Sequence, residues 1–502
     1  AARLGSFVQA HCADGKPERL GDYRVEFLAP AWPGEPIEME AHRVGAERGE
    51  LRIEATAYAI RGGERVAVVR AFAKVKMLKT AYIFPGQGIQ QQGMGMEGYG
   101  RSRAAKAVWD RADGYTREAL GFSLLRIVRE NPKELVVRGN RLVHPQGVLH
   151  LTQFTQVSMA VLAQAQVAEL IESGVAPKGG VVCGHSVGEY NAIGVSGILP
   201  LESVIEIVYQ RGMVMHRLVE RDESGESGYR MAVIRPHYAG LDHAGAEELV
   251  QEVRKETGHF IQIVNYNVRG RQYSVTGRIE ALDALNKALS KRSRGAKSPY
   301  VEIPGIDVPF HSEMLVDGVD DFRKTLDLRL PKEIDFEPLY QRYIPNLVPR
   351  PFTLDLAYIK EVYETTDSHI LKDVVERYDE LIKQPNELGR VLLIELLAWQ
   401  FASPVRWIET QELMIAPKEM GGMGVERILE IGVGYQPTLA NMARYSLKLM
   451  GPMAPDVEIL NIEAEAQRAF YQDEESTVVI PERASAVADV PAFPYQFRAL
   501  RN

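Results

Sequence analysis

Cysteine is scarce in this sequence: Cys12 and Cys183 are the only two among 502 residues. Two cysteines cannot build a disulfide framework or a cysteine-based zinc site, and such sparse use is typical of a reducing compartment. Apolar runs of the roughly 18 residues that a membrane span needs are missing as well. We therefore expect a cytoplasmic protein with no membrane contact and no bound metal.

Positive charge is also limited, because 59 basic side chains face 67 acidic ones and the formal net charge is -8. A broad phosphate-binding surface is therefore not expected, which argues against nucleic acid as a partner. The first residue is Ala1, and no basic segment followed by an apolar one marks a signal peptide. The sequence has the character of a piece of a longer chain, with length for about three domains at roughly 150 residues each.

The first 79 residues are rich in strand patterns. Four segments between residues 20 and 78 alternate apolar and polar positions and are separated by turn residues, which predicts a four-strand antiparallel meander. Any small β-domain could give this pattern. The run FLAPAWPGEPIEM resembles the second half of a hot-dog dehydratase, and this resemblance implies that the central helix and the catalytic pair of that fold lie upstream of Ala1.

From Thr80 onward strands alternate with helices, which predicts an α/β domain whose parallel sheet carries its site at the carboxyl ends of the strands. Residues 231–304 have the order βαββαβ of a ferredoxin-like subdomain inserted into this hydrolase-like domain. Residues 328–389 are acidic and rich in Tyr and Pro, and they fit neither period well; we expect them to form a helical insertion against the larger domain. The α/β domain is expected to end near residue 450, and residues 451–502 are expected to be a linker.

The strongest chemical signal is GHSVGEY at residues 184–190, which follows a short apolar strand and precedes a helical run. A G-x-S-x-G in this context is a nucleophile elbow that exposes the hydroxyl of Ser186. The serine needs a base, and among eleven histidines His311 stands out because it follows the strand-like IDVPF and opens a helical segment. For any single histidine, a surface or capping role is the ordinary alternative.

Arg211 lies on an apolar part of a helical segment about 25 residues beyond the serine. A buried arginine is costly unless it is paired, so it forms either a structural ion pair or a bidentate clamp for a substrate carboxylate.

Taken together, six motifs in order resemble the malonyl-CoA:acyl carrier protein transacylase family. They are PGQG at 85–88, GHSVGEY at 184–190, QRGMVM at 210–215, NYN at 265–267, VPFH at 308–311 and SPVRW at 403–407. The longer match, including GMGME, WDRADGY, IVRENPKEL and RYIPNL, is similar to the malonyl/palmitoyl transferase region of fungal-type type I fatty acid synthases, above all their bacterial single-chain form. A dehydratase tail in front of the transferase is also the domain order of that group.

The resemblance implies acyl transfer through an ester on Ser186, with His311 as general base and then acid. It also implies an oxyanion hole made by the backbone N–H groups of Gln87 and Val187, and a malonyl carboxylate held by Arg211. A backbone carbonyl orients the histidine in this family, and the segment from Gly434 to Gln436 is a candidate contributor.

Pocket residues implied in the same way are Phe310, Met215 and Asn267. Phe310 comes into the list because a Phe-His pair goes with malonyl units in related polyketide transferases. Met94, Met96 and Met213 are further candidates for lining a long acyl chain, against the alternative of a plain core role.

No cofactor is expected to be tightly bound. Coenzyme A thioesters are the implied substrates. The implied partners are a phosphopantetheine-bearing carrier protein and other synthase domains and subunits. Two rival readings stay open: a serine esterase or thioesterase, which shares the elbow but uses water as acceptor, and a non-enzymatic structural piece of a multienzyme.

Overall fold

The computed structural model describes residues 1–13, 15–47, 49–175, 179–222, 227–293 and 295–472, together with the backbone of 476–480. The chain divides into two compact units. The first consists of residues 1–78, 170–178 and 465–502, and the second of residues 79–169 and 179–464. None of the described helices combines the length and the apolar character that crossing a bilayer requires.

The first unit is built on a five-stranded antiparallel sheet with the order β1-β4-β3-β2-β16. Its strands are β1 (Leu20–Phe27), β2 (Ile37–Glu47), β3 (Glu50–Arg61), β4 (Glu64–Lys76) and β16 (Ser476–Ile480). The predicted meander is therefore wrong at its first strand, because β1 pairs with β4 and not with β2. The connection from β1 to β2 is long and contains Pro30, Pro33 and Pro36, so it does not impose a hairpin.

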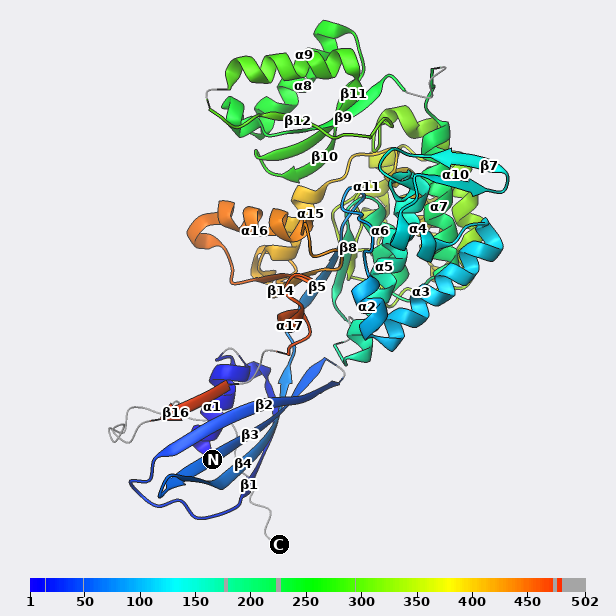
Figure 1. Ribbon diagram of the computed structural model, residues 1–502. Helices are drawn as coiled ribbons and strands as arrows, with labels where there is room; N and C mark the ends of the chain where they lie inside the picture. Colours follow the sequence, from blue (N-terminus) through cyan, green and yellow to red (C-terminus); the bar gives the residue numbers. More distant parts are fainter. Residues whose placement is uncertain are drawn as a thin grey trace. The chain divides into compact units, whose positions relative to one another are not determined.

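A helix, α1 (Ala2–Cys12), packs against this sheet (Figure 1). This helix was not predicted from the sequence. Leu4, Phe7 and Val8 are buried at the i, i+3 and i+4 spacing of an amphipathic helix, whose apolar side covers the alternating inward residues of β3 such as Leu51 and Ile53.

The second unit has a parallel five-stranded sheet with the order β13-β8-β5-β14-β15. Its strands are β5 (Thr80–Phe84), β8 (Val181–Gly184), β13 (Tyr343–Ile344), β14 (Arg427–Glu430) and β15 (Glu458–Asn461). β5, β8 and β14 are buried at every position, as expected for strands covered on both faces. The α/β fold class predicted from the sequence is confirmed.

Helices surround this sheet along the chain (Figure 1). Those before the inserted subdomain are α2 (Met96–Arg101), α3 (Arg103–Tyr115), α4 (Leu124–Glu130), α5 (Thr152–Glu172), α6 (Val187–Val195) and α7 (Leu201–Arg217). Those after it are α10 (Val319–Arg329), α11 (Leu356–Thr366), α12 (His369–Glu376), α13 (Tyr378–Leu381), α14 (Pro385–Gln400), α15 (Trp407–Ile415) and α16 (Leu439–Met450). A small hairpin of β6 (Glu134–Val137) and β7 (Asn140–Val143) completes the unit. The short helix α17 (Ala466–Ala469) belongs to the first unit.

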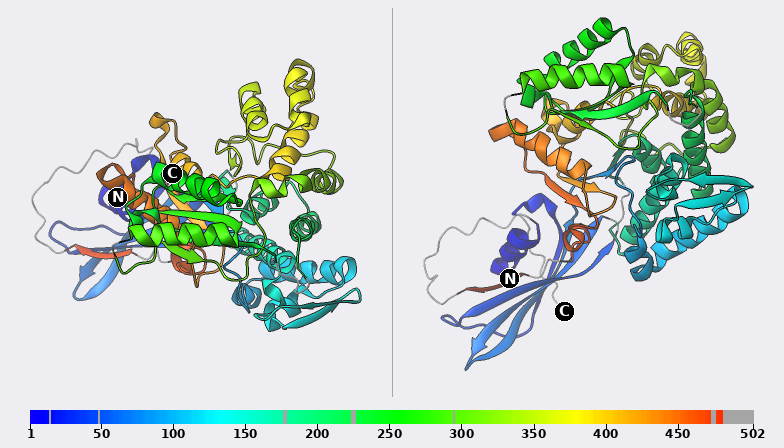
Figure 2. Two further views of the ribbon diagram at one scale, coloured as in Figure 1. Left: turned by 90° about the horizontal axis from the view of Figure 1, so that it is seen from above. Right: turned by 45° about the horizontal axis from the view of Figure 1, so that its top comes forward.

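The inserted subdomain has the predicted order βαββαβ. Its elements are β9 (Tyr229–Ile234), α8 (His243–Thr257), β10 (Ile261–Val268), β11 (Gln272–Arg278), α9 (Ile279–Arg292) and β12 (Tyr300–Glu302). The sheet order is β10-β11-β9-β12, and both helices lie on one of its faces (Figures 1 and 2). The outer strand β10 pairs with the core segment after α14 through a bridge between Asn265 and Val405.

Three sequence expectations differ from the structure. The segment IDVPF before His311 is not a strand: Pro309 interrupts it, and Pro304 and Gly305 lie directly before it. The stretch 328–389 holds helices α11 to α13 but also contributes the edge strand β13. In the expected linker 451–502, β15 completes the parallel sheet and β16 extends the first one, while residues 481–502 lie outside the described residues.

Candidate active site

Ser186 lies on a sharp turn between β8 and α6. Its backbone angles are φ 56° and ψ −120°, a strained conformation for a residue with a side chain. The two flanking glycines make this turn possible, because the backbone packs too closely around them to leave room for a side chain. A Cβ atom at Gly184 would lie 2.1 Å from the carbonyl of Gly188, and one at Gly188 would lie 1.9 Å from the carbonyl oxygen of Phe84. This is the geometry of a nucleophile elbow, and it places the hydroxyl at the carboxyl end of the sheet.

The structure brings His311 to this hydroxyl. Nε2 of His311 lies 2.7 Å from Oγ of Ser186, and Nδ1 lies 3.0 Å from the backbone carbonyl oxygen of Gln400. A carbonyl oxygen can only accept, so Nδ1 carries the proton and Nε2 is left as an acceptor for the serine hydroxyl. His311 itself has φ 60° and donates its backbone N–H to the carbonyl of Phe401.

The electrostatics of the site keep His311 neutral. Burial, assisted by the positive charge of Arg211, lowers the pKa of His311 to about 3. The imidazole is therefore unprotonated at neutral pH, as a general base must be before the reaction.

Arg211 on α7 is 1% exposed and reaches the same hydroxyl. Its Nη2 lies 3.3 Å from Oγ of Ser186 and donates to Oε1 of Gln400 at 2.9 Å. Its guanidinium lies 5.1 Å from the centre of the Tyr190 ring. Within the described residues these partners are neutral and no carboxylate forms an ion pair with Arg211. Burial lowers the pKa of Arg211, which Tyr190 and the carboxyl group of Glu189 oppose.

Gln400 and Asn346 fix the backbone of the elbow, and sequence analysis missed both. Asn346 accepts the backbone N–H of Ser186 at 2.8 Å and donates to the carbonyl of Gly184. Gln400 donates from Nε2 to the carbonyl of Ser186 at 2.6 Å. Each lies beside a motif that was recognised, Asn346 in RYIPNL and Gln400 three residues before SPVRW, and this proximity is the one signal that pointed to them.

The PGQG turn packs on the elbow from the end of β5. A Cβ atom at Gly86 would lie 2.9 Å from the carbonyl oxygen of His185, so the absence of a side chain permits the approach. The next residue, Gln87, lines the cavity beside Ser186. Val187 is the first residue of α6, where backbone N–H groups have no partner within the helix. Both backbones are thus placed beside the nucleophile.

The cavity at the serine has a volume of about 70 Å³. It is lined by Gly86, Gln87, Gln156, His185, Ser186, Arg211, Met231, Asn265, Ile306, Phe310 and His311. Phe310 is placed there as expected. Met215 and Asn267 are not in this lining, and the predicted pocket role of each is corrected: Met215 is buried in the helix packing near Gln156, and Asn267 lies behind His185.

The other methionine candidates, Met94, Met96 and Met213, are also outside this lining, while Met231 of β9 contributes to it. Gly434 to Gln436 do not orient His311. Gly434 donates its N–H to Glu463 at 2.8 Å, and Gln436 lines a different cavity of about 450 Å³ beside α16.

Known proteins that resemble this chain include acyl transferases, in agreement with the geometry of the site. Residues 81–303 match the family described as "Acyl transferase domain". The chain contains an acyl transferase domain. Over 85% of its length it is 33% identical to Fatty acid synthase 2 of Mycosarcoma maydis, and over 76% it is 29% identical to the fatty acid synthase subunit beta of Saccharomyces cerevisiae. It spans 13% and 22% of the lengths of these two relatives.

Solved structures share the fold. An acyl-carrier-protein-S-malonyltransferase from Bartonella henselae matches with a TM-score of 0.56 and 24% identity, over 78% of this chain and all of its own. A malonyl-transacylase solved in complex with its type II polyketide synthase acyl-carrier protein matches with a TM-score of 0.51 and 22% identity, over 76% of this chain and 94% of its own. At these identities the solved structures show a shared fold, and the resemblance predicted from the motifs is confirmed by the match over residues 81–303.

Proposed function

We propose that this acyl transferase domain moves malonyl groups, and also palmitoyl groups, between coenzyme A and an acyl carrier protein through an ester on Ser186. The observation that carries this proposal is Arg211: a buried cation that contacts the serine hydroxyl and has only neutral partners within the described residues. A guanidinium in this state is prepared to bind a carboxylate bidentately, and malonyl is a short acyl group that ends in a carboxylate.

In the first half-reaction His311 takes the proton of Ser186 as the hydroxyl oxygen attacks the thioester carbonyl carbon. The imidazolium that forms is held by the hydrogen bond from Nδ1 to the carbonyl of Gln400. The backbone N–H groups of Gln87 and Val187 would stabilise the oxyanion of the tetrahedral intermediate, an effect worth about 10²–10³ in rate for one donor. The intermediate then expels the thiolate of coenzyme A, which takes the proton from His311.

The second half-reaction runs in reverse with another thiol. His311 takes the proton of the carrier's phosphopantetheine thiol, the sulfur attacks the ester on Ser186, and the serine oxygen leaves with the proton. Water competes for the same ester, so transfer requires its exclusion.

The palmitoyl activity rests on the motif resemblance to malonyl/palmitoyl transferase regions and not on the cavity as it stands. A long acyl chain exceeds the volume at Ser186, so its distal part must extend beyond it or displace lining side chains such as Met231, whose thioether adapts readily to a different shape. Arg211 would contribute nothing to binding this neutral chain.

We propose a cytoplasmic location, carrier protein and other synthase domains as partners, and no tightly bound cofactor. We further propose that residues 1–79 derive from the second half of a hot-dog dehydratase, residues 80–450 from the transferase, with 231–304 and about 328–389 as insertions. The long antiparallel sheet with a helix packed on it supports the first part of this division.

One experiment separates the proposal from its rivals. The chain is incubated with radiolabelled malonyl-CoA and a holo carrier protein, and label is measured on the enzyme, on the carrier and as free malonate. Transfer predicts label on the carrier in excess of free malonate. An esterase or thioesterase predicts malonate alone, and a non-enzymatic piece predicts neither. The Ser186→Ala variant serves as the control for label bound without chemistry.

A further inference from the structure

The inserted subdomain reaches the nucleophile elbow through one side chain. Asn267 on β10 is 3% exposed, and its Oδ1 lies 2.9 Å from Nε2 of His185, the residue before Ser186. Its Nδ2 donates to Oγ of Ser274 at 3.4 Å. With the amide nitrogen committed to Ser274, the amide oxygen faces the imidazole, and an oxygen can only accept. His185 therefore carries its proton on Nε2.

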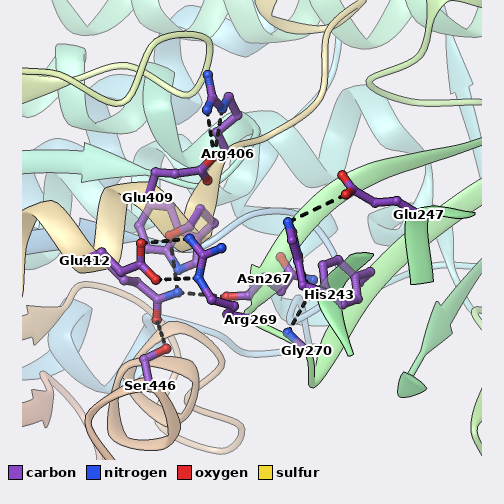
Figure 3. A network of polar contacts seen from close by, with 12 residues as sticks. His243, Glu247, Asn267, Arg269, Gly270, Arg406, Glu409, Glu412 and Ser446 are labelled. Carbon is purple, nitrogen blue, oxygen red and sulfur yellow. Dashed lines mark hydrogen bonds and ion pairs between the residues drawn. The ribbon is translucent and has the colours of Figure 1, made fainter. Parts of the chain in front are cut away.

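Asn267 is held in place from the core side as well. Gln411 on α15 is 1% exposed and donates from Nε2 to the backbone carbonyl of Asn267 at 2.7 Å, while Ser446 donates to Oε1 of Gln411 at 3.3 Å. Further out, Arg269 of the same hairpin forms a bidentate pair with Glu412 at 2.7 and 2.9 Å (Figure 3). Asn267 is thus held by Ser274 of β11 through its side-chain amide and by Gln411 of α15 through its backbone carbonyl.

His185 is a wall of the cavity, and its surroundings oppose a positive charge. The Trp407 ring lies edge-on with its centre 5.8 Å from that of the imidazole. Burial lowers the pKa of His185 to about 4, and the amide of Asn267 opposes this shift only in part.

The ionisable groups packed around the elbow are Arg211 and His311 in the cavity, Glu189 on α6 and Cys183 on β8. A charge on His185 would act on His311, because it would lower the pKa of that base further.

We propose that Asn267 is a positioning residue that fixes the proton of the neutral His185 imidazole on Nε2 and adds no charge beside it, so that His311 remains able to take the proton of Ser186. The proposal rests on the proposed acyl transfer at this site. A neutral amide at this place provides an acceptor without a charge. A carboxylate at this position would favour the imidazolium form of His185. The positive charge of that imidazolium would add to the charge of Arg211, and both charges would oppose the protonation of His311.

The tautomer is tested first, in a way that needs no activity. In the wild-type protein with ¹⁵N-labelled histidine, the resonances of His185, assigned with a His185→Gln variant, should show a neutral ring protonated on Nε2 from pH 5.5 to 8.5. A ring protonated on Nδ1, or one that becomes charged within this range, would overturn the proposal whether or not the chain transfers acyl groups.

The Asn267→Asp variant tests the consequence. A carboxylate at hydrogen-bond distance raises a histidine pKa by about 1–3 units, so His185 should become charged between about pH 5 and 7. The rate of label transfer from malonyl-CoA to Ser186 in a single turnover should then fall at least fivefold from pH 8 to pH 6 in the variant and stay level in the wild type. Superimposable profiles of variant and wild type would overturn the role of Asn267.

Arg269→Ala is the matched control, because Arg269 lies two residues away in the same hairpin and also contacts α15, but through an exposed ion pair. It should keep the wild-type pH profile. If this variant acquired the same acid-side loss, the effect would come from seating of the subdomain and not from the charge of His185, and the proposal would fail. A wild-type chain that forms no acyl-enzyme at any pH would instead contradict the proposed function, while the tautomer experiment would still stand.

Discussion

Nη2 of Arg211 lies 3.3 Å from Oγ of Ser186, on a hydroxyl that His311 also contacts at 2.7 Å. A base and a fixed cation thus share one nucleophile. The base explains how the hydroxyl is activated, and the cation explains which acyl group the site would prefer. The predictions below separate these two contributions.

Ser186→Ala should abolish the acyl-enzyme and leave the fold intact. The hydroxyl lies at the cavity wall and contributes little to packing, whereas the backbone of the turn is held by Asn346 and Gln400. The measurement is protein-bound label after incubation with malonyl-CoA, with circular dichroism as the check on folding. Label on a folded Ser186→Ala protein would show that another residue is acylated.

His311→Ala should slow acylation severely, because within the described residues no other imidazole lies at hydrogen-bond distance from Ser186. The wild-type pH profile follows from the pKa of His311, which is lowered to about 3. A base with a lowered pKa stays unprotonated as the pH falls, so single-turnover acylation should be level from pH 8 down to about pH 5. A loss with a midpoint near the ordinary histidine value of about 6.5 would contradict this.

Whether a residue of this site could be predicted from the sequence depends on whether it acts through its side chain or through its backbone. Ser186, His311 and Arg211 act through side chains with distinctive chemistry, and the structure brings all three together as their motifs suggested. Gln400 orients His311 with a backbone carbonyl, a group that every residue possesses and that leaves no mark in a sequence. Asn267 was assigned to the pocket from its motif, but alternation along β10 cannot tell that Asn265 faces the cavity while Asn267 faces His185.

The fold, like the site, could be predicted in some parts and not in others. Strands of the parallel sheet could be predicted because burial on both faces makes them short apolar runs, as in β5 and β8. β13 is two residues long and β15 follows a segment without clear periodicity, so neither carried a signal. The pairing of β1 with β4 depends on contacts between segments distant in sequence, which the pattern of each strand alone does not contain.

Glu189→Gln should change the dependence of stability on pH. Burial raises the pKa of Glu189 to about 7, although hydrogen bonds from Tyr343 and from the backbone of Asn346 lower it. A raised pKa means that the folded state binds the proton more tightly than the unfolded one, so this stabilisation is complete below the ordinary value of about 4.3 and is lost as the pH rises through about 7. The glutamine keeps an acceptor for Tyr343 and cannot ionise.

The urea midpoint of the wild type should therefore fall more between pH 5 and pH 8 than that of Glu189→Gln. Parallel pH dependences of the two proteins would contradict the raised pKa. Glu202→Gln is the control, since Glu202 lies in the first turn of α7 and its pKa is lowered, through the side chain of Arg111, below the range of the measurement.

Phe310→Ser should relax the discrimination against methylmalonyl-CoA. Phe310 lines the cavity next to the base, where its ring fills volume that a branched acyl group would need. The gain for the branched substrate relative to malonyl-CoA should be at most about 1–3 kcal/mol, the worth of one methylene-sized contact. The ratio of the two kcat/KM values in variant and wild type measures it, and an unchanged ratio would remove Phe310 from substrate selection.

Arg211→Ala should separate the two acyl groups. Malonyl transfer should lose about 2 kcal/mol or more in kcat/KM, within the range for hydrogen bonds to a charged group, because the substrate carboxylate loses its cation. Palmitoyl transfer should be spared or improved, because its neutral chain gains nothing from a guanidinium that must otherwise stay solvated or paired. His311 should also become a stronger base, since Arg211 contributes to the low pKa of the imidazole.

Arg217→Ala, an exposed position near the end of the same helix, is the control and should leave both activities unchanged. The decisive quantity is the ratio of malonyl to palmitoyl kcat/KM in variant and wild type. If both activities fall equally, Arg211 serves the structure of the elbow through Gln400, and the assignment of one site to two substrates loses its main support.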